Sequence, residues 1–154
     1  MTTRKIQAGF TLVELIVVLT IISIVAAIVA SSALAARVQA NEGAVRGALK
    51  TVQSASISYR SSQGAYAVSL AALGSSYLGG GLESGDKSGY RFELKAGNQG
   101  ETYTCTAVPK TANFTGVRSY CTDVFNAIYL YDNAPGLTAD GSSCPPGGTA
   151  LAGG

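Results

Sequence analysis

One long apolar segment near the N-terminus dominates the hydrophobic pattern of the chain. No charged residue occurs from Leu15 to Ala36, and neither Pro nor Gly interrupts this run. A helix of that length spans roughly 33 Å, enough to cross a hydrocarbon core of about 30 Å. A helix also satisfies its own backbone hydrogen bonds in lipid. The pattern therefore predicts a membrane-spanning helix, which we assign to residues 10–36.

An amphipathic helix pattern continues from residue 37 to residue 62. Its apolar residues recur at helical intervals and fall on one face: Val38, Val45, Leu49, Val52 and Tyr59. We expect this face to pack against the sheet of the same head domain. Residues 63–89 are rich in Gly and Ser and predict a connecting loop, in which residues 69–73 could form a short helix.

Apolar and polar residues alternate in four short runs of the next segment, residues 90–132. The alternation predicts strands at 90–95, 102–108, 117–122 and 127–131, in an antiparallel sheet with the amphipathic helix over its apolar face. The predicted fold class is α+β, with a long N-terminal helix packed on a small antiparallel sheet. Residues 133–154, rich in Gly and Pro, predict a surface loop or a loose tail with little to bury.

The composition argues against an enzyme. The chain has no His, which removes the commonest general base and metal ligand, and we expect no catalytic residues, metal or cofactor. A calcium site at Asp123, Asp132 and Asp140 is the alternative to solvated turn acids, but these residues lack the EF-hand spacing. The 11 basic and 9 acidic residues do not indicate a nucleic-acid partner.

A short polar segment precedes the apolar run and contains Arg4 and Lys5 but no acid. It ends at Gly9, before the string Gly9-Phe10-Thr11-Leu12-Val13-Glu14-Leu15. The string resembles the N-terminus of the type IV pilin family, which includes the pseudopilins, and a signal anchor would match it only by chance. The resemblance implies a pilin-like fold, a leader peptide at residues 1–9, cleavage between Gly9 and Phe10, and methylation of the Phe10 amine. Many members have a Pro near the middle of the helix, where this chain has Ser31.

The resemblance also implies a function. The precursor would be a single-pass inner-membrane protein with a cytoplasmic N-terminus, which agrees with the positive charges of Arg4 and Lys5. A prepilin peptidase would remove the leader, and the assembly platform would move subunits from the lipid into a helical homopolymer. Glu14 of one subunit would pair with the Phe10 ammonium of another, which fixes register more than it adds stability.

Three other functions remain as alternatives to a subunit of a type IV pilus. A pseudopilin of a type II secretion system would share all these N-terminal features and stay in the periplasm, but the absence of Trp favours the extracellular pilus. A membrane-anchored enzyme is disfavoured by the lack of His. A minor pilin that binds DNA during uptake would need a basic stripe on its head, for which five residues are available: Lys87, Arg91, Lys95, Lys110 and Arg118.

The head of an exported protein folds in an oxidising compartment, so a disulfide is expected. If the strands at 102–108 and 117–122 pair across a turn centred near Asn113, Cys105 and Cys121 stand directly opposite each other, and we favour this pair. The alternative pair is Cys121 and Cys144. It would staple the tail to the sheet, and it resembles the C-terminal disulfide loop of many pilins.

Overall fold

The computed structural model describes residues 9–151, with backbone only for residues 29–31. Its long helix is α1 (Leu12–Gln63), followed by α2 (Leu70–Tyr77). The strands and two 3-10 turns come next: η1 (Leu82–Ser84), β1 (Asp86–Lys87), β2 (Tyr90–Gly97), η2 (Asn98–Gly100), β3 (Thr102–Pro109), β4 (Arg118–Asp123), β5 (Ile128–Asp132) and β6 (Thr149–Ala150). The chain divides into two compact units between Ala36 and Arg37.

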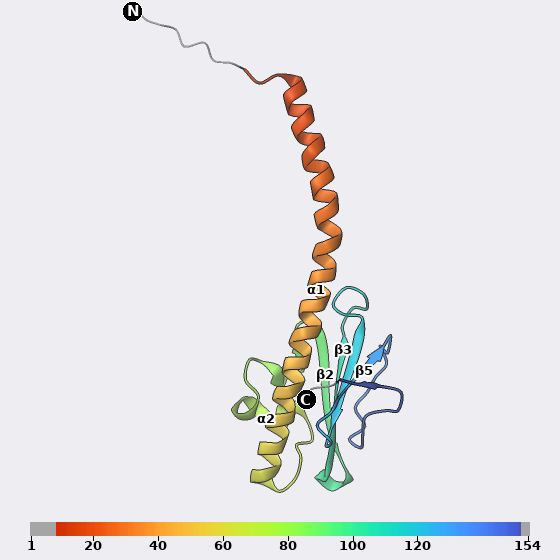
Figure 1. Cartoon of the computed structure of the whole chain (residues 1–154). Helices are drawn as coiled ribbons and strands as arrows, with labels where there is room; N and C mark the ends of the chain where they lie inside the picture. Colours follow the sequence, from red (N-terminus) through yellow and green to blue (C-terminus); the bar gives the residue numbers. More distant parts are fainter. Residues whose placement is uncertain (1–8, 152–154) are drawn as a thin grey trace, which may run out of the picture. The chain divides into compact units, whose positions relative to one another are not determined.

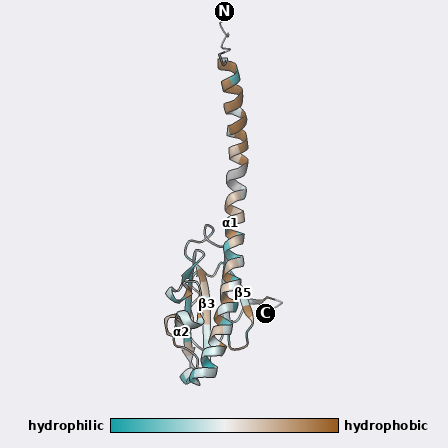
Figure 2. Ribbon diagram, turned by 90° about the vertical axis from the view of Figure 1, so that its left-hand side faces the viewer, coloured by the Kyte–Doolittle hydropathy of each residue, from teal (hydrophilic) through white to brown (hydrophobic). Residues whose placement is uncertain are grey.

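The N-terminal unit contains the apolar half of α1, where most of the ribbon is coloured as hydrophobic (brown in Figure 2). The large apolar side chains of this half are exposed. By length and composition, α1 is the one helix of the described residues that could cross a membrane. Two polar side chains in this half bond to carbonyls of their own helix: the Thr20 hydroxyl donates to Val17 at 2.8 Å and that of Ser23 to Leu19 at 2.7 Å. These hydroxyls therefore do not oppose burial in lipid.

The second unit is an antiparallel sheet covered by the amphipathic half of α1, which confirms the predicted α+β class (Figure 1). All six strands pair with their sequence neighbours, in the order β1 to β6. Val45, Leu49 and Val52 of α1 are fully buried in one core with Tyr90 of β2 and Tyr103 of β3. The stripe predicted from helical spacing thus faces the sheet, and α2, capped by the Ser69 side chain, adds Leu70 and Leu73 to the core.

The register of β3 and β4 differs from the prediction by one residue. Thr106 stands opposite Cys121 and Cys105 opposite Thr122. The connecting turn is not symmetric about Asn113, because the Thr115 hydroxyl accepts from the Thr111 N–H at 3.1 Å and donates to the Thr111 carbonyl at 3.0 Å. Since neighbouring side chains in a strand point to opposite faces, this shift puts Cys105 and Cys121 on different faces of the sheet.

The predicted Cys105–Cys121 disulfide is therefore wrong. Cys105 is buried in the core shared with α1 and is a free thiol. Cys121 instead bonds to Cys144, with a Cα–Cα distance of 5.8 Å. This is the alternative pairing, and it ties the C-terminal segment to the sheet.

The C-terminal segment also differs from the predicted loose tail. It crosses the sheet face opposite α1, where the Ser119 hydroxyl donates to the Ala134 carbonyl at 2.8 Å and Ala139 is 2% exposed. Gly141, with φ +86°, lies so close to β2 that an added Cβ would stand 2.6 Å from the Ala96 backbone. Strand β6 then pairs with β5. Backbone contacts and the disulfide thus supplement the few apolar side chains of this segment.

Candidate processing and assembly site

The predicted cleavage bond lies in backbone without regular structure. Gly9, Phe10 and Thr11 precede the first helical residue, Leu12, and the Phe10 side chain is 86% exposed. An added Cβ on Gly9 would meet no other described atom within 4 Å. Nothing in the described part of this chain therefore demands a small residue at position 9, and any such requirement would come from the enzyme that cleaves there. Residues 1–8, with Arg4 and Lys5, lie outside the described part.

A capping box joins Thr11 and Glu14 at the start of α1. The Glu14 N–H donates to the Thr11 hydroxyl oxygen at 3.2 Å. In return, Glu14 Oε2 accepts from the Thr11 N–H at 3.0 Å and from the Thr11 hydroxyl at 2.8 Å. These reciprocal bonds satisfy donors that a helix N-terminus leaves free. Glu14 Oε1 accepts no hydrogen bond from the described residues, so this oxygen is available to a partner.

A functional role is predicted from the sequence for Glu14, whereas Thr11 is not among the predicted site residues. The signal was present, because Thr-x-x-Glu directly before an apolar run is a capping-box pattern. The structure brings Thr11 and Glu14 together at the first turn and leaves the Gly9–Phe10 bond just upstream.

Residues 4–30 match the family of the prokaryotic N-terminal methylation motif. The chain carries the signature of type IV pilins and pseudopilins. A comparison with curated proteins gave no match. The matched segment contains Gly9, Phe10, Thr11 and Glu14, and runs through most of the uncharged helix. Together the motif and helix indicate a pilin-like structural protein that is processed at its N-terminus and polymerises, with a membrane-anchored precursor.

A buried carboxylate fastens α1 to the sheet in this pilin-like chain. Glu42 is 7% exposed, and its Oε1 accepts from the backbone N–H groups of Val117 at 3.1 Å and Arg118 at 3.3 Å. Its Oε2 accepts from the Arg118 guanidinium at 3.4 Å and the Tyr120 hydroxyl at 3.3 Å. The charge of Glu42 raises the pKa of Arg118, and burial, with Glu42 second, raises the pKa of Tyr120 to about 12. Glu42 is not among the site residues predicted from the sequence.

The five basic residues considered for a DNA-binding stripe do not form an unpaired row. Lys95 pairs with Glu93 at 2.8 Å and Lys110 with Asp86 at 2.9 Å. Arg118 lies between Glu42 and Asp132, each 3.4 Å away. Three of the five cations therefore lie beside a carboxylate, which reduces the positive charge that a phosphate backbone would meet there.

The aspartates considered for calcium have separate partners. Asp123 is buried and accepts from the N–H groups of Phe125 and Cys144, both at 3.0 Å. Asp140 accepts from the Ser142 N–H at 2.8 Å, and this hydrogen bond is the main cause that lowers the pKa of Asp140. Asp132 forms an ion pair with Arg118. Within residues 9–151, no group of three or more Cys, Asp or Glu side chains could hold a metal ion.

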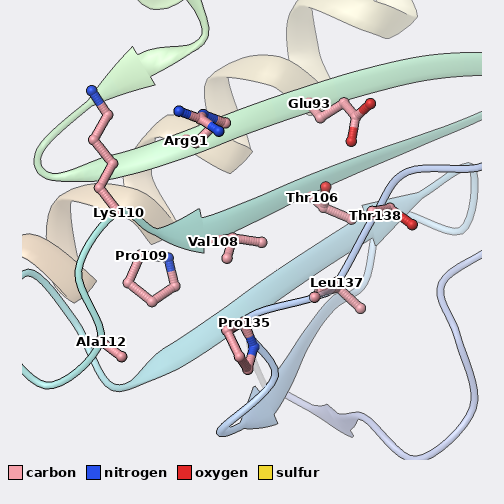
Figure 3. Close-up of a pocket in the computed structure, with 11 residues that line it drawn as sticks. Arg91, Glu93, Thr106, Val108, Pro109, Lys110, Ala112, Pro135, Leu137 and Thr138 are labelled. Carbon is pink, nitrogen blue, oxygen red and sulfur yellow. The ribbon is translucent and has the colours of Figure 1, made fainter.

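A groove of about 510 Å³ opens on the sheet face that carries the C-terminal segment (Figure 3). Its apolar lining includes Val108 from β3 with Pro135 and Leu137 from the crossing loop. Two of its charged residues, Glu93 and Lys110, already have ion-pair partners.

The free thiol of Cys105 should be unreactive in the folded head. It is fully buried, and burial raises its pKa to about 12, with a smaller effect from the charge of Glu93. Because the thiolate is the reactive form, we expect negligible alkylation by iodoacetamide at pH 8 and complete alkylation in denaturant, measured by mass spectrometry. The folded state keeps the Cys105 proton at a higher pH than the unfolded chain does. The stability that this proton contributes is therefore fully present below the unfolded thiol's pKa of about 8.5, and the free energy of unfolding falls as the pH rises from there toward 12. Rapid alkylation of the folded chain would contradict this burial.

Proposed function

We propose that this chain is a structural subunit that polymerises into a bacterial type IV pilus after leader cleavage and N-methylation. The observation that carries the proposal is the methylation motif at the start of a long apolar helix with exposed side chains. Such a surface needs an apolar cover, which lipid would supply before assembly and neighbouring α1 helices would supply in the filament.

Maturation would begin in the inner membrane, with residues 1–9 in the cytoplasm. A prepilin peptidase would hydrolyse the Gly9–Phe10 bond and create a new amine on Phe10. Methylation of this amine keeps its positive charge. The assembly platform would then transfer the mature subunit from the lipid into the growing filament.

Glu14 would direct the assembly step. Its Oε2 is engaged by Thr11, and its Oε1 is available for the Phe10 ammonium of a neighbouring subunit. In the low-dielectric core of a helix bundle, an unpaired carboxylate is costly, so subunits would associate in the register that pairs the two charges. The apolar side chains of the rest of this helix half would supply contact area between neighbouring subunits, but they do not specify the register.

The head would form the outside of the filament. It is closed by the Cys121–Cys144 disulfide, and it buries its own core beneath the amphipathic half of α1. A secreted filament benefits from such a covalent link, because an oxidising environment keeps it intact.

Electron microscopy of producing cells before and after deletion of the gene tests this function. We expect the deletion to remove all surface pili, and a plasmid copy of the gene to restore them. Intact pili together with loss of protein secretion would show a pseudopilus subunit instead. Intact pili with loss of DNA uptake alone would show a minor pilin.

A further inference from the structure

The capping box lies beside the bond that maturation would cleave. Thr11 is the last non-helical residue before α1, and its carbonyl accepts from the Leu15 N–H at 3.3 Å. In an α-helix the N-cap carbonyl is the first one used by an intrahelical hydrogen bond. The Gly9 carbonyl, which belongs to the cleavage bond, therefore lies two residues before the first carbonyl that the helix engages.

Thr11 stops the helix at this point through its side chain. Its hydroxyl oxygen accepts the Glu14 N–H, and the Glu14 carboxylate accepts the N–H and hydroxyl of Thr11. These three bonds fix Thr11 in the cap position, which has non-helical backbone angles. Phe10 and Gly9 then stay outside the helix.

Without this cap, α1 could begin earlier. Gly9 is the nearest suitable residue upstream, because Gly is close to Thr as an N-cap and far better than Phe. A helix capped by Gly9 would engage the Gly9 carbonyl with the Val13 N–H and enclose the cleavage bond in its first turn. Since proteases act on locally open backbone, the helical population would be protected.

We infer that Thr11 is a positioning residue for leader cleavage, because its bonds to Glu14 hold the Gly9–Phe10 peptide outside α1. The inference rests on the proposed function, in which a peptidase cleaves that bond. Glu14 would then act before assembly as well, because its hydrogen bonds hold Thr11 in the cap position.

The test measures initial rates of leader removal from the purified full-length precursor in detergent micelles with a purified prepilin peptidase. Thr11→Ala removes the cap, whereas Thr11→Asn supplies a capping oxygen without a hydroxyl. Loss of a typical N-cap shifts the local equilibrium about fivefold toward the longer helix. Because the wild-type bond lies mostly outside the helix, this shift lowers the open fraction, and with it kcat/KM, by up to about threefold for Thr11→Ala. Thr11→Asn should cleave at the wild-type rate, because Asn is among the best N-caps.

Amide hydrogen exchange of the same micelle samples supplies a readout that does not depend on the peptidase. The Val13 N–H should gain protection in Thr11→Ala and remain unprotected in the wild type and in Thr11→Asn. An intact Cys121–Cys144 disulfide in each variant, checked by non-reducing peptide mapping, shows that the head has folded.

Two results would overturn the inference while leaving the proposed function in place. One is an unchanged cleavage rate for Thr11→Ala. The other is slow cleavage of both Thr11→Ala and Thr11→Asn beside normal cleavage of Thr11→Ser, which would mean that the peptidase contacts the hydroxyl itself. A wild-type precursor that is not cut between Gly9 and Phe10 would overturn the proposed function, and the inference with it.

Discussion

The Glu14→Ala variant is expected to enter the membrane normally and to form few or no filaments. Insertion should not suffer, because the change removes a charge that is costly in an apolar helix. Assembly should suffer, because the Phe10 ammonium of a neighbour would be buried without a partner. Removing one member of a buried ion pair costs about 3–5 kcal/mol, so each subunit contact should weaken by at least about 100-fold. Filament yield after shearing, beside precursor and mature protein in the membrane fraction, measures both effects.

Glu14→Gln is the matched control for this experiment. Gln also occupies the last position of a capping box, so its amide oxygen can replace Glu14 Oε2 as the acceptor for Thr11. The variant thus keeps the cap and loses the charge. We expect normal leader cleavage and poor assembly. A normal filament yield from either variant would show that Glu14 does not pair with Phe10 in the filament.

Loss of the Cys121–Cys144 disulfide should have the second largest effect. The bond closes a segment with a sequence separation of 23 residues. Loop-closure entropy for such a segment predicts about 3 kcal/mol of stabilisation, and a unit of this size should lose roughly 10 °C in Tm. Cys144→Ser is the suitable change because Cys144 is only half-buried. Thermal unfolding of the full chain in detergent micelles measures the loss.

Two comparisons make the disulfide experiment specific. Wild-type protein treated with a reductant should lose about as much stability as Cys144→Ser. In that variant, Cys105 and Cys121 should both remain free thiols, because the β3–β4 register holds them on opposite faces of the sheet. A Cys105–Cys121 disulfide in oxidised Cys144→Ser would contradict this register.

Much of the fold could be predicted from hydrophobic spacing alone. The core stripe of α1 and the alternating strands followed from side-chain direction, which has a period of 3.6 residues in a helix and two in a strand. Val45, Leu49 and Tyr90 lie where that periodicity places them. The capping box was also visible in the sequence, because Thr-x-x-Glu depends on local backbone geometry.

The remaining features depend on contacts between distant residues. The register of β3 and β4 depends on the turn in which Thr115 bonds to Thr111, and an assumed symmetric turn places every pair one residue off. The C-terminal segment is held largely by hydrogen bonds between sheet side chains and its backbone and by a disulfide, and such contacts produce no hydrophobic period in the sequence. Glu42 follows the spacing of the core stripe, three residues before Val45, and a charged residue at a core position was the one signal of a buried anchor.

The N-terminus of the protein in isolated filaments tests the central claim most directly. Filaments sheared from cells are digested, and mass spectrometry identifies the first peptide. We predict that the protein begins at Phe10 with one added methyl group on its amine. As a control, Gly9→Leu should leave uncleaved precursor in the membrane. Filament protein that retains residues 1–9, or that begins inside the apolar run from Leu15 to Ala36, would contradict the account.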